Sequence, residues 1–309
     1  MGVFVFLPLV LPLSAWPVAR LAENRLHPRT ATRLLTAVAV VMAVCSTLCL
    51  ALLMVVGTAQ LPGNPLPDGW SDPEVRAAVP HDEVAGRAAI PALAAVTAAC
   101  ARTLWRHRRV TRRARRALAG VPGPTVAVLP DSTPYAYALP GGRGRIVAST
   151  ALLAGLAPAE RRALFAHERA HLTARHYRHL LAAHLAARAN PFLRPLRTAV
   201  VYTAERWADE EAARAVGDRR TVARAIGKAA LLSPRTPAPT LAALAATGPV
   251  PRRVAALLAP APAARTWPSA FTAVGLAAWG AAAGALASAM SSANSAVTLV
   301  LILRAATPL

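Results

Sequence analysis

The feature that most constrains this chain is an uncharged apolar run from Leu34 to Val56. A helix needs about 20 apolar residues to cross the hydrocarbon core of a bilayer, and this run is long enough. Only 16% of the residues are charged, whereas an ordinary soluble domain carries about 25%. The sequence therefore predicts an integral membrane protein rather than a soluble globule.

Three further segments have the character of membrane spans: residues 1–19, residues 84–105 and an uncharged stretch that begins after Arg265. Within the last stretch, residues 270–290 are the expected crossing, because they are apolar and rich in small side chains. The polar residues at 291–295 are expected to interrupt the stretch and to leave a second, short segment behind them. We therefore predict about four transmembrane helices.

The positive charge indicates how these spans are oriented. The formal net charge is +21, and nearly all of it is arginine, since Lys228 is the only lysine. The arginines gather at residues 20–33 and 102–116, next to apolar segments, as expected of cytoplasmic flanks. Residues 62–83, which carry acidic side chains, are then expected outside the cell. No stacking platform or groove-reading motif accompanies the arginines, so we expect no direct binding of nucleic acid.

The chain is predicted to have three parts: an N-terminal membrane region at 1–105, a cytoplasmic domain at 106–265 and a C-terminal membrane segment at 266–309. The middle part begins with short β-prone runs at 125–129, 135–139 and 145–149, which are separated by turn signals. From Pro158 onwards it reads as helical, with further helices at 194–216 and 221–232 and a loop at 233–239. The predicted fold is mainly α, with a cytoplasmic α+β domain.

The chemistry-bearing motif is His167-Glu168-Arg169-Ala170-His171. Two histidines four residues apart on a helix project from one face, so His167 and His171 can bind a single zinc ion. Glu168 lies beside them and can act as the general base that takes a proton from water. This is the HExxH arrangement of zinc peptidases. A catalytic zinc needs a third protein ligand, for which Glu205 on a separate helix is the candidate.

Other polar residues near these ligands have different expected roles. Asp209 follows Glu205 by one helical turn and is expected to hydrogen-bond a ligand imidazole, which fixes the tautomer of that ring. Glu210 and Glu211 are competing carboxylates, for which solvated helix charges are the favoured interpretation. His176 is expected on the same helix as His167, and its nine-residue separation predicts that it points to the opposite side. A structural role is favoured for it and for the nearby His179 and His184.

The two ligand motifs, His167-Glu168-Arg169-Ala170-His171 and Glu205-Arg206-Trp207-Ala208-Asp209, resemble those of the integral-membrane gluzincins, the HtpX-type and BlaR/MecR-type peptidases. The similarity extends over about residues 124–258. It implies a zincin-type domain in which a small β-sheet edge hairpin precedes the catalytic helix.

The resemblance to this family implies that the edge strand binds the main chain of the substrate by strand addition. The residues that it assigns to substrate binding are Ala136, Tyr137, Ala138 and Leu139. The resemblance also implies a closing helix in which Arg253 supports the site. Some relatives carry a histidine shortly before this arginine, which could stabilise the oxyanion, but residues 248–252 contain none. The oxyanion partner is therefore unassigned.

The leading functional hypothesis is a multi-pass cell-membrane endopeptidase with one catalytic zinc ion, a cytoplasmic catalytic domain and polypeptide substrates. One alternative follows from the BlaR/MecR-type resemblance: a signal-transducing peptidase that inactivates a transcriptional repressor. The other is a non-enzymatic, arginine-rich membrane scaffold. The complete set of His167, Glu168, His171 and Glu205 favours the peptidase, because a scaffold has no need for it.

Overall fold

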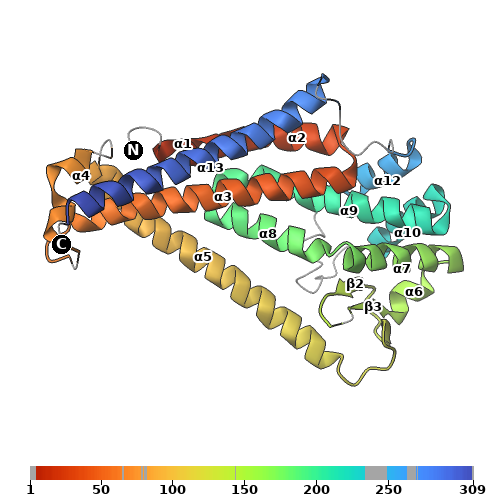
Figure 1. Cartoon of the computed structure of the whole chain (residues 1–309). Helices are drawn as coiled ribbons and strands as arrows, with labels where there is room; N and C mark the ends of the chain where they lie inside the picture. Colours follow the sequence, from red (N-terminus) through yellow and green to blue (C-terminus); the bar gives the residue numbers. More distant parts are fainter. Residues whose placement is uncertain are drawn as a thin grey trace.

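The structure of the chain is a computed structural model, shown in Figure 1, which describes residues 5–64, 66–77, 79, 82–142, 144–233, 249–262, 269 and 271–307. It is mostly helical. Its described residues form one small sheet, which lies at one end of the molecule in space. Apart from Ser233, the loop expected at 233–239 lies outside the described residues.

The elements up to the sheet are α1 (Leu7–Val10), η2 (Leu11–Ser14), α2 (Ala15–Arg25), α3 (Pro28–Ala59), η3 (Asp68–Ser71), α4 (Pro73–Ala77) and α5 (Asp82–Ala117). The sheet contains β1 (Val126–Leu129), β2 (Ala136–Leu139) and β3 (Arg145–Ser149). The elements after it are α6 (Thr150–Ala154), α7 (Pro158–Thr173), α8 (His176–Ala189), η4 (Pro191–Leu193), α9 (Arg194–Val216), α10 (Arg219–Leu232), α12 (Val250–Leu258) and α13 (Ala273–Ala305). The expected helix at 194–216 and the expected strand at 145–149 have these same bounds.

Three of the described helices, α3, α5 and α13, are long and apolar enough to cross a membrane. The expected interruption of the last span is wrong, because α13 continues through Ser291, Ser292 and Ser295 as one helix of 33 residues. The Ser292 hydroxyl donates to the Ser288 carbonyl oxygen at 2.9 Å. A serine that bonds within its own helix does not have to break it, even in apolar surroundings.

The first predicted span is not a single long helix. Residues 7–25 form three consecutive short elements, α1, η2 and α2. Pro8, Pro12 and Pro17 lie in this segment, and each removes one backbone donor from a helical hydrogen-bond ladder. The two α-helices of this segment, α1 and α2, pack along α3 and α13. The count of four spans therefore stays a prediction.

The two helices α3 and α5 cross where two glycines meet. A Cβ atom added to Gly57 would lie 2.2 Å from the carbonyl carbon of Gly86, so no larger side chain fits without moving a helix. We expect Gly57→Leu to lower the free energy of unfolding by at least the 1–3 kcal/mol that is typical of overpacking. Thermal unfolding in detergent measures this loss. The matched control is Gly280→Leu in α13, where an added Cβ has no neighbour within 4 Å, and an equal loss there would contradict the argument.

The sheet has the strand order β1-β3-β2, in which β1 is parallel to β3 and β2 is antiparallel to it. The antiparallel pair confirms the expected hairpin, and its turn uses Gly141 at a φ of 111°, which a side chain would disfavour. Ser149 donates its backbone N–H to the carbonyl oxygen of Tyr135. Bonded and non-bonded pairs alternate along such a ladder, so the main-chain groups of Ala136 and Ala138 point away from β3, towards the free edge.

The helices α8 and α9 pack directly against the candidate span α3. One apolar cluster joins residues 15–43 to residues 180–204 and to Ala281. Two buried polar contacts tie the same elements together. Thr32 donates to the Thr203 hydroxyl at 3.0 Å, and the Asn190 amide donates to the Ser46 hydroxyl at 3.0 Å. Residues of the first two predicted parts, 1–105 and 106–265, therefore belong to one apolar cluster. The predicted division of the chain at residues 105 and 265 stays a prediction.

Candidate metal centre

The helix α7 carries the first two candidate ligands. It begins at Pro158, where a proline is tolerated because the first N–H of a helix has no internal partner. The Glu160 carboxylate accepts a hydrogen bond from the backbone N–H of Ala157 at 2.9 Å and so caps this end. Two turns further on, the Nε2 atoms of His167 and His171 lie 3.1 Å apart. The four-residue spacing therefore brings both imidazoles to one point, as the sequence predicted.

The helix α9 brings the candidate third ligand to the same point. One carboxylate oxygen of Glu205 lies 3.4 Å from Nε2 of His167, and the other lies 3.3 Å from Nε2 of His171. Ligand atoms of these three residues all lie within 4.8 Å of one another. Two imidazoles and one carboxylate make up a donor set that catalytic zinc sites use. The site is therefore compatible with a metal ion.

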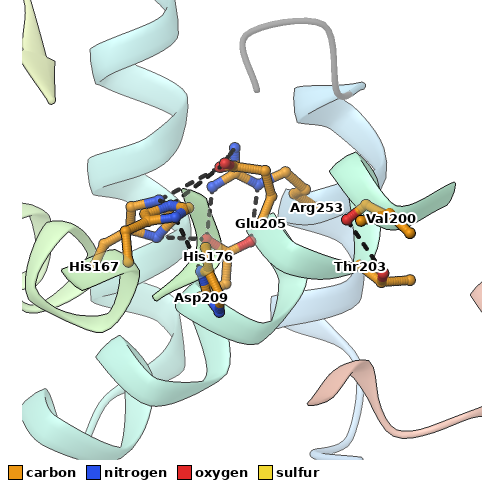
Figure 2. A network of polar contacts seen from close by, with 8 residues as sticks. His167, His176, Val200, Thr203, Glu205, Asp209 and Arg253 are labelled. Atoms are coloured by element: carbon orange, nitrogen blue, oxygen red, sulfur yellow. Dashed lines mark hydrogen bonds and ion pairs between the residues drawn. The ribbon is translucent and has the colours of Figure 1, made fainter. Parts of the chain in front are cut away.

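Two further residues, Asp209 and Arg253, lie next to the candidate ligands, as Figure 2 shows. Nδ1 of His167 lies 3.0 Å from a carboxylate oxygen of Asp209, which is fully buried. The guanidinium of Arg253 donates to both oxygens of Asp209, at 2.9 and 2.7 Å, and lies 2.8 Å from Glu205. The arginine comes from α12, so three separate helices meet here. The expected proximity of Arg253 to the site is thus seen.

The predicted position of His176 is wrong. The helix that carries His171 ends at Thr173, and Arg175 adopts the left-handed conformation, with φ 53° and ψ 42°. The chain turns at this residue, and α8 starts afresh at His176. As a result, Nδ1 of His176 lies 3.0 Å from Nδ1 of His171. No glycine or asparagine marks position 175, so the sequence carries no ordinary signal for a left-handed residue.

His176 is fully buried beside an aromatic residue of α9. Its ring centroid lies 4.6 Å from that of Trp207, whose indole N–H donates to Glu211 at 3.0 Å. The guanidinium groups of Arg29 and Arg33 lie 5.7 and 5.4 Å from the centroid of the same indole. Cation–π contacts of this kind are favourable, and here they connect the start of the candidate span α3 to the surroundings of the metal ligands.

Glu168 is buried next to the free edge of β2. Burial raises the pKa of its carboxyl to about 7, and the charge on Glu205 adds to this effect. His167, Arg253 and a hydrogen bond from the Ala138 backbone oppose the rise in the pKa. A carboxyl with a pKa near neutrality is suited to taking up and releasing a proton at physiological pH.

Burial and neighbouring charges act in opposite directions on the ligands. Burial alone would raise the pKa values of Glu205 and Asp209, but Arg253 outweighs it and holds both below their usual range. Burial lowers the pKa of His171 to about 4 and that of His176 to about 2. Burial also acts to lower the pKa of His167, but Asp209 and Glu205 prevail and raise it to about 10.

The four residues of the expected substrate strand alternate between buried and partly exposed positions. The side chains of Tyr137 and Leu139 are buried in a small apolar cluster with Val147, so they face the core of the domain. Ala136 and Ala138 are partly exposed, and their main-chain groups face outward. A substrate strand added to β2 would therefore pair with the main chain of Ala136 and Ala138. It would not contact the phenol of Tyr137.

The competing carboxylates lie away from the three ligands. Glu210 is buried and pairs with Arg206 at 3.1 Å and with Arg219, so the expectation of a solvated charge is wrong for this residue. Glu211 accepts from Trp207 and pairs with Arg214 at 2.6 Å. Each has a basic partner of its own, whereas Glu205 is the carboxylate that lies near the Nε2 atoms of both His167 and His171.

Comparison with known proteins gives one match. Residues 100–189 match the model of Peptidase family M48, a region that contains His167, Glu168, His171 and His176 and ends before Glu205. The match supports a zinc metallopeptidase, and hence a hydrolase, in agreement with the donor set. No curated protein and no solved structure matches the chain significantly. The finer resemblance to the HtpX-type or BlaR/MecR-type peptidases stays a prediction.

Proposed function

We propose that this protein is a membrane-bound zinc endopeptidase in which His167, His171 and Glu205 bind one zinc ion. The observation that carries the proposal is the convergence of three ligand atoms within 4.8 Å, beside a buried glutamate and an open strand edge. A zinc ion at this position would polarise the peptide carbonyl and make a nearby water more acidic. The protein must supply the base, the orientation of the ligands and the binding of the substrate.

Glu168 is the general base in this proposal. It takes a proton from the attacking water and passes it to the nitrogen of the departing amine, so that one residue acts as base and then as acid. Its burial supports this cycle, since burial raises the pKa of the carboxyl to about 7. The oxyanion partner is still unassigned among the protein side chains.

The substrate binds as an extended strand along the outer edge of β2. The main-chain groups of Ala136 and Ala138 that point away from β3 provide its hydrogen bonds, as in other cases of strand addition. Glu168 is close enough to Ala138 for the backbone there to influence its pKa. A peptide paired with this edge would therefore run past the general base. Main-chain recognition of this kind favours extended or unfolded polypeptides.

Asp209 and Arg253 orient the ligands. Nδ1 of His167 lies 3.0 Å from a carboxylate oxygen of Asp209, and this carboxylate would hold the ring proton on Nδ1 and leave Nε2 free to bind the metal. Arg253 compensates part of the negative charge of Asp209 and Glu205, the two carboxylates that it contacts. Without a cationic partner, two carboxylates in a buried site would repel each other and take up protons.

His176 orients the second histidine in the same way. When Nε2 of His171 binds the metal, its Nδ1 carries the ring proton, and that N–H donates to Nδ1 of His176. The two ligand imidazoles thus have different supports, a carboxylate for His167 and a neutral imidazole for His171. Trp207 packs on the ring of His176 and limits its rotation.

We expect His176→Leu to weaken zinc binding by about 10- to 100-fold, the usual effect of losing an outer hydrogen-bond partner of a metal ligand. His176→Asn should retain most of the affinity, because its amide oxygen can accept in place of Nδ1. Competition for zinc with a chromophoric chelator measures both effects. The control is His179→Leu, on the same helix without a contact to a ligand. Equal losses in the Leu and Asn variants would contradict the positioning role.

The site lies close to the membrane. The candidate span α3 begins at Pro28, and its Thr32 bonds Thr203, two residues before Glu205. We infer that the catalytic domain is cytoplasmic, since the arginine-rich ends of α3 and α5 flank it. The protein is then a multi-pass cell-membrane peptidase whose substrates reach the site near the bilayer surface. Nothing in the described residues favours a repressor as the substrate, so the proposal names polypeptides only.

The test combines metal content with cleavage of casein for detergent-purified wild type and Glu205→Ala. Wild type should contain close to one zinc per chain and cleave casein, whereas Glu205→Ala should lose most of both. Wild-type protein that neither holds zinc nor cleaves an unfolded polypeptide would contradict the proposal. In that case the arginine-rich scaffold would become the leading hypothesis.

A further inference from the structure

The second half of α5 carries a face that the proposed chemistry does not use. Beyond the apolar part of the helix, one face forms a groove of about 640 Å³. The end of the groove nearer the apolar part is lined by Leu104 and Trp105, and the other end is lined by arginines, among them Arg108, Arg109, Arg112 and Arg116. In Figure 1 this half of α5 diverges from α3 and runs towards the sheet.

The positive charge of this face is not balanced within the protein. Some arginines elsewhere pair with carboxylates, as Arg206 and Arg219 both do with Glu210. Over the part of the chain that the structure describes, Arg108 and Arg112 have no such ion pair and are exposed to solvent. Several guanidinium groups on one face repel one another, so an anionic ligand there would be favoured.

The order of side chains along the groove indicates the kind of anion. The helix is a candidate membrane span, so its apolar part lies in the hydrocarbon region and Trp105 comes next. Trp105 is 57% exposed, and tryptophan is enriched at the level of the lipid headgroups. Arg112 follows it by seven residues, which is roughly 10 Å along a helix. A phospholipid has the same order, with acyl chains first and then the phosphate.

We propose that this face of α5 binds the headgroup of an anionic phospholipid, with the phosphate on Arg108, Arg109 and Arg112 and the acyl chains along Leu104 and Trp105. Guanidinium groups bind phosphate oxygens through paired, charge-assisted hydrogen bonds. A nucleic acid fits the groove less well. The groove has one aromatic ring, Trp105, and the guanidinium of Arg109 lies over it at 4.9 Å from the centroid, whereas single-stranded nucleic acids bind by stacking successive bases on several aromatic side chains.

The other face of α5 connects the bound lipid to the sheet. Arg115 donates from Nε and Nη2 to the carbonyl oxygen of Pro140, at 3.2 and 2.8 Å, and Pro140 directly follows β2. Arg145 of β3 in turn donates to the carbonyl oxygen of Leu118, at 2.9 Å, just after α5 ends. A lipid on the cationic face would therefore hold the edge strand at a constant depth relative to the bilayer.

Native mass spectrometry of the full chain in detergent tests the proposal. The probes are phosphatidylglycerol and phosphatidylcholine with identical acyl chains, and the test variant combines Arg108→Gln, Arg109→Gln and Arg112→Gln. Wild type should retain phosphatidylglycerol in preference to phosphatidylcholine. The triple variant should bind phosphatidylglycerol about 100-fold more weakly, since each arginine near a membrane surface contributes roughly fivefold.

The matched control combines Arg162→Gln, Arg178→Gln and Arg220→Gln, which remove the same charge from exposed positions outside α5. It should bind phosphatidylglycerol as wild type does. Equal weakening in both triple variants would overturn the proposal, as would equal retention of the two lipids by wild type. Displacement of the lipid by millimolar inorganic phosphate or by single-stranded DNA would overturn it too, because the groove would then bind phosphate groups without regard to the lipid. Peptidase activity is not measured, so the outcome does not depend on the proposed catalysis.

Discussion

Glu168→Gln is expected to lose most of the cleavage of casein and to keep zinc bound, because the amide keeps the shape of the side chain and cannot take up a proton. A positioned general base contributes about 10²- to 10⁴-fold to a rate, so the residual activity should be at least two orders of magnitude below that of wild type. Glu168 is not one of the three residues whose ligand atoms converge. The zinc content should therefore equal that of wild type. Metal analysis and a cleavage assay on the same sample measure both quantities.

The matched control for this variant is Glu211→Gln on α9. Glu211 contacts Trp207 and Arg214 and does not face the histidines, so its loss should change activity by no more than a few fold. Full activity in Glu168→Gln would contradict the role of Glu168 as the base. Loss of zinc together with activity would instead indicate that Glu168 holds the ligands in place.

The second large effect is expected for Arg253→Met. Removal of one partner from a buried ion pair typically costs about 3–5 kcal/mol, because the remaining charge is left without compensation. Arg253 is buried and contacts both Asp209 and Glu205. We expect a loss of this size in the free energy of unfolding of the zinc-free protein. The loss should be smaller with zinc bound, because the ion also compensates the carboxylates.

The pH dependence of this loss has a definite sign. Asp209 has its pKa lowered to about 2, chiefly because Arg253 outweighs burial, whereas an unfolded aspartate titrates at about 3.9. A lowered pKa stabilises the folded state fully above the unfolded value, and the contribution is lost as the pH falls through the folded value. The contribution of Asp209 to the stability of wild type should thus be constant at neutral pH and be lost between about pH 4 and pH 2.

Thermal unfolding in detergent with a chelator, repeated across this pH range, measures the effect. Arg252→Met is the control, since that neighbouring side chain is exposed and its contacts are a 3.3 Å pair with Glu23, a 3.3 Å hydrogen bond to the Asn24 side chain and a contact with the Tyr202 ring. It should change the free energy of unfolding by about 1 kcal/mol or less. Equal destabilisation by the two substitutions would contradict the role of Arg253.

Local patterns in the sequence predicted much of the structure. The apolar run at 34–56 lies within α3, and the β-prone runs coincide with the three strands. Both results follow from side-chain periodicity and turn residues, which act over a few neighbours. The same holds for His167, His171 and Glu168, since a four-residue spacing on a helix determines which side chains share a face. Glu205 and Asp209 share a face of α9 for this reason as well.

Other features depend on contacts between segments that lie far apart in the chain. The contact between His176 and His171 depends on a left-handed Arg175, which no local preference predicts. Arg253 reaches Asp209 across 44 residues, and the burial of Ser292 and Ser295 in α13 depends on the helices packed around them. Hydrophobic periodicity is a property of one element, whereas these features depend on how several elements pack. The sequence by itself thus determined most of the helices, the strands and the candidate ligands, and the tertiary structure decided which buried groups lie beside those ligands.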